Sequence, residues 1–203
     1  ESNSFINEWL EKYPFEHDFN NNKEKYNNFI DNFRMTKEEI KLIIENKEEV
    51  SEMIAIAALK YADFLSNRTT DYIFDPVKFT DLNGKTGVYI VYSNIRMKSL
   101  LDNAKHISYN NLSVLKEIDK SIAIKLLEVP KILEISYNTK SLNVIADYLY
   151  ELSNLYNNLY SNNRILTEND VNLRESRLVL SNIVYKTTSK LIDILGIKVP
   201  ERM

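Results

Sequence analysis

Two tyrosines and an arginine are the residues of this chain whose types and spacing best suit chemistry. Tyr89, Tyr92 and Arg96 stand at positions i, i+3 and i+7, so a helix would place all three on one face. Tyrosine rings stack on flat groups, and a guanidinium pairs with anions through several N–H donors. The spacing is therefore compatible with a helix face that holds a flat, negatively charged ligand.

The same helix also has the pattern of a buried core segment. Val88, Val91 and Ile95 repeat the i, i+3, i+7 spacing and give the helix an apolar stripe. Tyrosines at helical spacing within a helical bundle most often belong to its core. Composition and spacing leave both interpretations open.

Few other residues suit catalysis or metal binding. The chain has no cysteine, and its histidines, His17 and His106, lie far apart in the sequence. It contains no H-E-x-x-H zinc motif, no G-x-S-x-G nucleophile motif and no phosphate-binding Walker loop. Its many carboxylates fall on polar helix faces, and none stands out as half of an acid–base pair. We therefore expect no catalytic residue and no metal site in this chain.

The composition indicates a folded, water-soluble domain made of helices. Hydrophobic residues make up 44% and charged residues 27%, which is typical of globular rather than disordered proteins. With 3 glycines and 4 prolines there is room for few turns, which favours long helices. The net charge of −3 excludes a strongly basic surface, so any RNA binding must rest on a few local residues. No apolar run approaches the ~18 residues of a membrane span.

Periodicity and capping signals predict an all-α bundle of about five major helices. Thr36-Lys37-Glu38-Glu39 forms a capping box, which predicts a helix that extends to about Phe64. Thr167 and Asp170 are expected to cap the last helix, and Gly196 is expected to follow its end near Leu195. The other expected helices span residues 87–104, 112–128 before Pro130, 131–136 and 142–160.

The chain is expected to have two parts. Residues 1–35 are aromatic, acidic and rich in asparagine, with irregular apolar spacing, and the sequence assigns them no role. Residues 36–203 are expected to form the helical domain. The chain starts at Glu1 without an initiator methionine or a signal sequence, so we interpret it as a fragment of a longer protein. The absence of cysteine fits a cytoplasmic setting.

Ordered motifs in the second part resemble those of a known family. Gly84-Lys85-Thr86-Gly87-Val88-Tyr89, followed by Tyr92-x-x-x-Arg96-x-Lys98-Ser99, resembles a signature of the arginyl-tRNA synthetases, which are class I aminoacyl-tRNA synthetases. Lys85, Val88 and Val91 depart from that signature, which usually has Asn, Pro and Gln there. The further similar stretches are Ala58-Leu59-Lys60-Tyr61-Ala62-Asp63, Ser66-Asn67-Arg68-Thr69-Thr70-Asp71-Tyr72-Ile73-Phe74-Asp75, Leu126-Leu127-Glu128-Val129-Pro130-Lys131-Ile132-Leu133, Tyr148-Leu149-Tyr150-Glu151-Leu152 and Leu195-Gly196-Ile197-Lys198-Val199-Pro200-Glu201-Arg202-Met203.

This resemblance implies an all-α anticodon-binding domain, which follows the catalytic domain in these enzymes. The chain would bind the anticodon stem-loop of the tRNA for arginine and would contact its own upstream catalytic domain. That upstream domain would attach arginine to the tRNA with ATP and magnesium, so this chain alone is expected to be catalytically inactive. The alternative hypothesis is a helical protein–protein interaction module that derives from such a domain and no longer reads RNA.

The resemblance also assigns the residues expected to contact the tRNA. Tyr89 and Arg96 are expected to face the RNA, whereas Tyr92 is assigned equally to the RNA and to the core. Tyr160 would lie at a helix end where a base can reach it. The full predicted set is Asn83, Lys85, Thr86, Tyr89, Tyr92, Arg96, Arg68, Tyr160 and Met203. Structural roles are expected for Tyr148, Tyr150 and Tyr156.

Overall fold

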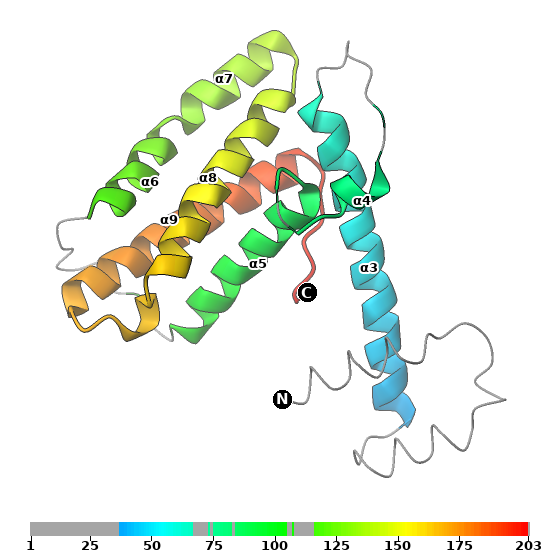
Figure 1. The fold of residues 1–203 in the computed structure, drawn as a ribbon, viewed down its shortest axis with the longest axis horizontal. Helices are drawn as coiled ribbons and strands as arrows, with labels where there is room; N and C mark the ends of the chain where they lie inside the picture. Colours follow the sequence, from blue (N-terminus) through cyan, green and yellow to red (C-terminus); the bar gives the residue numbers. More distant parts are fainter. Residues whose placement is uncertain are drawn as a thin grey trace. The chain divides into compact units, whose positions relative to one another are not determined.

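The computed structural model describes residues 37–66, 73, 75–82, 84–104, 107 and 116–202. The chain divides into two compact units, Glu1–Lys47 and Glu48–Met203. The described part of the first unit is the beginning of α3. All regular elements of the described residues are helical (Figure 1), so the all-α prediction is confirmed. They are α3 (Lys37–Leu65), α4 (Pro76–Phe79), α5 (Gly87–Asn103), α6 (Glu117–Leu127), α7 (Val129–Thr139), α8 (Asn143–Asn162), the 3-10 turn η1 (Ile165–Thr167) and α9 (Val171–Ile194). Within these ranges no helix has the length and hydrophobicity that a bilayer crossing demands.

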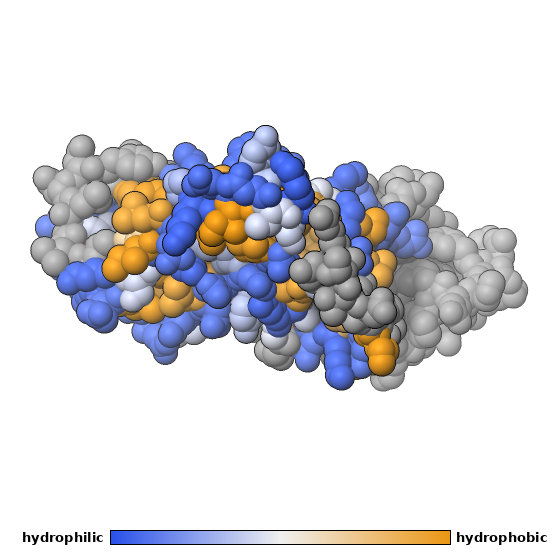
Figure 2. Space-filling view, turned by 90° about the horizontal axis from the view of Figure 1, so that it is seen from above, coloured by the Kyte–Doolittle hydropathy of each residue, from blue (hydrophilic) through white to orange (hydrophobic). Residues whose placement is uncertain are grey.

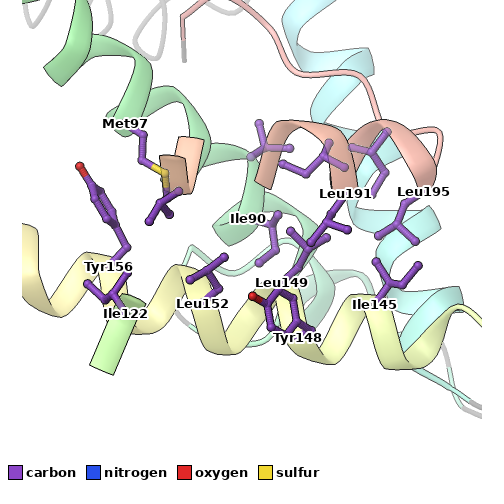
Figure 3. Packing of buried hydrophobic residues seen from close by; sticks show 14 of the residues in the cluster. Ile90, Met97, Ile122, Ile145, Tyr148, Leu149, Leu152, Tyr156, Leu191 and Leu195 are labelled. Carbon is purple, nitrogen blue, oxygen red and sulfur yellow. The ribbon is translucent and has the colours of Figure 1, made fainter. Parts of the chain in front are cut away.

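The core of the second unit lies between α5, α8 and α9, whose apolar side chains point toward one another (Figure 3). α8 turns an apolar face to this core, because Leu149, Leu152 and Tyr156 are fully buried. Met97 of α5 and Leu191 of α9 belong to the same cluster. Each such side chain contributes about 1.5–3 kcal/mol when it leaves water. This packing therefore holds α5 in a fixed position against α8.

Three buried tyrosines tie the helices together through their hydroxyl groups. Tyr61 of α3 donates to a backbone oxygen of α8 at 2.7 Å, and Tyr148 of α8 donates to a backbone oxygen of α6 at 2.7 Å. Tyr156 of α8 donates to the Ser181 hydroxyl of α9 at 3.0 Å. Burial raises the pKa of all three phenols, that of Tyr156 to about 12, because the charged phenolate would lose its water.

The start of α6 differs from the sequence prediction. The helix begins at Glu117 rather than near Leu112, because Lys116 has an extended backbone (φ −75°, ψ 172°). The Asp119 carboxylate accepts the backbone N–H of Lys116 at 3.1 Å, which completes the cap. The predicted part of this helix before residue 116 lies outside the described residues.

α7 follows α6 after a single intervening residue, Glu128, and both helices pack against α8. Pro130 lies in the first turn of α7, where a helix does not use the missing N–H. The helix extends to Thr139 and is longer than the predicted 131–136. It ends because Lys140 adopts a left-handed conformation (φ 54°) and donates its backbone N–H to the Ser136 oxygen.

α9 begins and ends with side-chain and backbone caps. The Asp170 carboxylate accepts a backbone N–H of the first turn at 3.1 Å. Thr167 belongs to η1 instead, so the prediction that it helps to cap α9 is wrong. Gly196 follows the end of the helix as predicted, with φ 63°, a conformation that favours glycine. The backbone N–H of Ile197 donates to the Ile192 oxygen at 3.2 Å, which closes the helix end.

A buried ion cluster joins α6 to α9. The Arg177 side chain is 1% exposed, and its Nε lies 3.3 and 3.4 Å from the two carboxylate oxygens of Asp119, which is 0% exposed. Its Nη1 lies 3.3 Å from a carboxylate oxygen of Glu168. The cluster therefore fixes the start of α9 against the start of α6.

α5 begins in direct contact with α3. A Cβ atom at Gly87 would lie 2.1 Å from the backbone oxygen of Ala57 and 2.9 Å from the Cβ of Tyr61. No side chain fits at those distances, so glycine permits the close approach of the two helices. This contact sets the position from which the tyrosine-bearing face of α5 extends.

The surface carries apolar side chains beside hydrophilic ones (Figure 2). Ile124 and Leu127 of α6 and Tyr137 of α7 are among the exposed large side chains. Apolar atoms supply more than half of the surface of ordinary folded proteins, so such residues alone identify no binding site. The specific contacts that point to a site lie between α5 and α8.

Candidate nucleic-acid interface

The loop before α5 fixes where this helix begins. The Thr86 hydroxyl accepts the backbone N–H of Tyr89 at 3.1 Å and donates to the backbone oxygen of Asp81 at 2.6 Å. Gly84 has φ 112°, a conformation that side-chain-bearing residues rarely adopt. Thr86, one of the predicted contact residues, is itself buried and holds the start of the helix in place.

α5 carries both of the stripes that the sequence suggested. Val88 and Val91 are buried in the core, whereas Tyr89, Tyr92 and Arg96 are half-buried. The two interpretations are therefore compatible, because they describe different sides of one helix. The polar and aromatic side of α5 meets α8, which lies beside it (Figure 1).

Arg96 binds two tyrosine rings from two helices. Its Nη2 donates to the Tyr92 hydroxyl at 2.5 Å, and its guanidinium carbon lies 4.5 Å from the centre of that ring. The same carbon lies 5.0 Å from the centre of the Tyr160 ring on α8. These cation–π contacts bring together three residues that the sequence analysis had placed in the same site.

Lys85 belongs to a second group at the beginning of α5. Its Nζ lies 2.5 Å from a carboxylate oxygen of Asp147 and 5.7 Å from the centre of the Tyr150 ring. The Tyr150 ring in turn lies 5.7 Å from the Tyr89 ring, at an angle of 52°. Tyr89 therefore lies between α5 and the aromatic side of α8.

Asn157 of α8 connects these groups, although the sequence analysis did not select it. Its Nδ2 donates to the Tyr89 hydroxyl at 2.8 Å and to the Ser93 hydroxyl at 2.5 Å. Its Oδ1 accepts from Nη1 of Arg96 at 3.4 Å. One amide thus contacts three residues of α5.

A sequence signal for this side of α8 does exist. Asp147, Tyr150, Asn157 and Tyr160 follow one another at intervals of three, seven and three residues, which places them on one helix face. The same helix also carries the apolar face of Leu149, Leu152 and Tyr156. The sequence does not indicate which residues an asparagine or aspartate on a partly exposed face will contact. Only the packing of α5 against α8 shows that Asp147 and Asn157 contact residues at the start and along the side of α5.

We call this surface the α5–α8 platform and define it as Lys85, Tyr89, Tyr92, Arg96, Tyr150, Asn157 and Tyr160. It offers aromatic rings for stacking and two cations for pairing with anions. The predicted contacts Asn83, Arg68 and Met203 lie outside the described residues. Among the residues that the structure describes, no group of three or more histidines, cysteines or carboxylates could hold a metal ion.

A sequence model described as the DALR anticodon binding domain matches residues 90–203. The chain belongs to this family. The match contains most of the α5–α8 platform, including Arg96 and Asn157. A second sequence model, described as the catalytic domain of class I (R) tRNA synthetases, matches residues 24–76, which include α3. The division of the chain at residues 35 and 36 stays a prediction.

Curated relatives of this DALR-domain chain are arginine–tRNA ligases. The ligase of Pseudoalteromonas translucida (strain TAC 125) is 33% identical over 174 residues, which cover 84% of this chain and 30% of the relative. That of Pasteurella multocida (strain Pm70) is 33% identical over 166 residues, which cover 80% of this chain and 30% of the relative. The chain therefore spans about a third of the length of these proteins.

Solved structures with the same fold carry similar descriptions. Thermus thermophilus arginyl-tRNA synthetase matches with a TM-score of 0.72 and 28% identity, over 77% of this chain and 28% of that one. Arginyl-tRNA synthetase from Plasmodium falciparum matches with a TM-score of 0.70 and 26% identity, over 81% of this chain and 30% of that one. These similarities agree with the resemblance stated from the sequence motifs.

Proposed function

We propose that this chain is the tRNA-binding portion of an arginine–tRNA ligase and that its α5–α8 platform contacts the anticodon stem-loop. The observation that carries the proposal is that most of the platform lies within the matched DALR domain, with Lys85 and Tyr89 just before it. The family match and the relatives favour this function over the protein–protein interaction module considered from the sequence.

The platform has the chemistry that single-stranded RNA requires. Bases in an anticodon loop can leave their stack and lie on aromatic side chains, which contributes about 1–3 kcal/mol per base. Tyr89, Tyr92 and Tyr160 offer such rings, and Arg96 and Lys85 offer charges for phosphates. Because this charge is local, the net charge of −3 for the chain does not oppose binding at the platform.

The complete protein would contain a catalytic domain upstream of the residues described here. That domain would use ATP and magnesium to attach arginine to the tRNA for arginine, in the cytoplasm. The match of residues 24–76 to a synthetase catalytic domain supports this arrangement. This chain alone would bind the tRNA without charging it.

The proposal is tested by binding of the chain to transcribed tRNA for arginine and to versions with a changed anticodon. The tRNA with its own anticodon should bind more tightly than the changed versions. Tyr89→Ala should weaken binding about 5- to 150-fold, the equivalent of one lost stack. Arg96→Ala should weaken binding and also reduce the slope of log affinity against log salt by about 0.7–0.9, the effect of one lost phosphate contact.

Tyr137→Ala is the matched control for these substitutions. Tyr137 is an exposed tyrosine on α7, outside the platform, so its loss should change the affinity less than about twofold. Equal and negligible binding to every RNA would show that the proposed function is wrong. An equal loss of affinity in Tyr137→Ala and Tyr89→Ala would show that the platform is not the binding surface.

A further inference from the structure

We propose that Asn157 is a positioning residue that turns the hydroxyl proton of Tyr89 outward, so that this part of the platform binds hydrogen-bond acceptors. This inference rests on the proposed function, since the acceptors would be phosphate oxygens and base carbonyls of the anticodon loop. It means that one amide determines which chemical groups the Tyr89 hydroxyl can bind.

The orientation of the Asn157 amide follows from its neighbours. A guanidinium has only N–H donors, so the atom of Asn157 that faces Nη1 of Arg96 must be its oxygen. The amide nitrogen then faces the hydroxyl oxygens of Tyr89, at 2.8 Å, and of Ser93, at 2.5 Å. Arg96 therefore fixes the amide, and the amide fixes what the two hydroxyls do.

An amide nitrogen can only donate, so the Tyr89 hydroxyl must accept from it. Its own proton is then left for another partner, and in the part of the chain that the structure describes it has none. The Tyr92 hydroxyl is in the same state, because Nη2 of Arg96 donates to it at 2.5 Å. Both tyrosine hydroxyls therefore accept a hydrogen bond, and neither donates one to a residue that the structure describes.

The resulting surface presents hydrogen-bond donors, namely two phenolic O–H groups and the remaining N–H groups of Arg96. An RNA loop offers many acceptors, which include its phosphate oxygens and the carbonyl groups of its bases. A hydroxyl that donates to a phosphate forms a charge-assisted hydrogen bond, which is stronger than a neutral one. Asn157 would therefore contribute to RNA binding through Tyr89 without touching the RNA.

Asn157→Asp tests this inference in the full chain. A carboxylate only accepts, so Tyr89 would turn its proton inward to Asp and lose the outward donor. The affinity for the transcribed tRNA for arginine should fall about tenfold or more, the size of a hydrogen bond to a charged group. The thermal unfolding temperature, measured by circular dichroism, should stay close to that of the unmodified chain, because the carboxylate still accepts from Arg96.

Asn158→Asp is the matched control. It adds the same charge one residue further along α8, at an exposed position outside the platform. The Asn158 Oδ1 accepts from Nδ2 of Asn162 at 2.5 Å, and an aspartate there would still accept. Its effect on affinity measures the added negative charge alone and should be about threefold or less.

Tyr89→Phe supplies a second, independent measurement. It keeps the ring for stacking and removes the outward proton, so its affinity should also fall about tenfold. When Tyr89→Phe is combined with Asn157→Asp, the second substitution should have only the small effect of Asn158→Asp. This coupling distinguishes a positioning role from a general structural one, because a structural defect would persist without the Tyr89 hydroxyl.

Three outcomes overturn the inference alone while the unmodified chain still binds tRNA. They are an unchanged affinity of Tyr89→Phe, an effect of Asn157→Asp no larger than that of Asn158→Asp, and a full effect of Asn157→Asp in the Tyr89→Phe background. Absence of tRNA binding by the unmodified chain overturns the proposed function and, with it, this inference. The unmodified chain therefore tests the proposed function, and the variants test the role of Asn157.

Discussion

Lys85 and Asp147 form an ion pair at the edge of the α5–α8 platform, and their side chains are 42% and 44% exposed. Pairs with this exposure contribute only about 0.2–1 kcal/mol, because water and salt screen them. A tRNA phosphate can therefore compete with Asp147 for the lysine. The carboxylate would act as a weak competitor of RNA at this position.

Asp147→Asn should consequently raise the affinity for tRNA. Removal of a competitor worth about 0.2–1 kcal/mol corresponds to an increase of up to about fivefold at low salt. The slope of log affinity against log salt should steepen by about 0.7–0.9 if Lys85 gains one phosphate. Titration of the tRNA at several salt concentrations gives both quantities.

Glu134→Gln on α7 is the control for Asp147→Asn, because it removes the same charge from an exposed position outside the platform. It should raise the affinity much less, and it should leave the salt slope unchanged. An equal increase in both variants would show that only the net charge matters. An unchanged affinity in Asp147→Asn would contradict competition at Lys85.

The sequence predicted part of the platform at this scale. The spacing of Tyr89, Tyr92 and Arg96 was sufficient to place them on one face, because helical periodicity is a local property. Asn157 could not be selected, since its role depends on the contact between α5 and α8, 60 to 70 residues apart in the chain. Val88 and Val91 depart from the family signature but are buried, so these departures concern packing rather than the platform.

At the scale of elements, the contact of α5 with α3 depends on one glycine. A methyl group at Gly87 would overlap the Ala57 oxygen, so Gly87→Ala should force the two helices apart. We expect a loss of at least about 1–3 kcal/mol in the free energy of unfolding, as for other overpacked sites. Urea denaturation followed by circular dichroism measures this loss.

Ser99→Ala provides the comparison within α5, because Ser99 is exposed and alanine favours a helix. Its free energy of unfolding should stay within about 0.5 kcal/mol of the unmodified value. Equal stability of Gly87→Ala and Ser99→Ala would contradict the close approach of α5 to α3.

The buried cluster of Arg177, Asp119 and Glu168 predicts a large stability effect. Arg177→Met would leave the fully buried Asp119 carboxylate without its guanidinium, which typically costs about 3–5 kcal/mol. The double variant Arg177→Met/Asp119→Asn should recover part of this loss, because asparagine still accepts from the Lys116 backbone N–H without a charge. Urea denaturation of the single and double variants checks both expectations.

Arg174→Met is the control for Arg177→Met, since Arg174 pairs with Glu175 at a partly exposed position. Its loss should cost no more than about 1 kcal/mol. If Arg177→Met were equally mild, the cluster would not be an important constraint between α6 and α9.

Element boundaries show where sequence reasoning was sufficient and where it was not. Gly196 was placed correctly just after α9, because the preference for a positive φ is a property of a single residue. Pro130 was expected between two helices, but it lies in the first turn of α7, where its missing N–H is tolerated. The start of α6 at Glu117, later than predicted, was missed, since the N-cap residue Lys116 is not one of the usual capping residue types. The Arg177–Asp119 pair was also missed, because a charged helical residue normally indicates the solvent side.

At the scale of the whole molecule, the buried tyrosines predict unfolding at alkaline pH. The pKa of Tyr156 is raised from 10.0 to about 12, and those of Tyr61 and Tyr148 are also raised, in each case mainly by burial. Below pH 10 these phenols are neutral in both states, so they do not change the free energy of unfolding. Above pH 10 only the unfolded chain releases their protons, so stability should fall as the pH rises toward 12.

The measurement combines helicity with tyrosinate absorbance during a titration above pH 10. The chain has 13 tyrosines, and we expect the buried ones to ionise only as the helical signal is lost. Ionisation of all tyrosines near pH 10 with retained helicity would contradict this expectation. A loss of helicity that precedes any tyrosinate signal would show that other groups cause the alkaline transition.

The contact of α3 with the core limits how the DALR domain can be exchanged between related proteins. Residues 24–76 match a catalytic domain, yet Ala57 and Tyr61 of α3 are fully buried among helices of the DALR domain. Lys60 also donates to the backbone oxygen of Gly196, just beyond α9. The two family matches therefore do not correspond to two independently packed domains, because α3 belongs to one match and packs in the core of the other. Recombination that exchanged residues 90–203 between ligases would set α3 of one protein against the bundle of another, whereas transfer of α3 with the bundle would keep this packing intact.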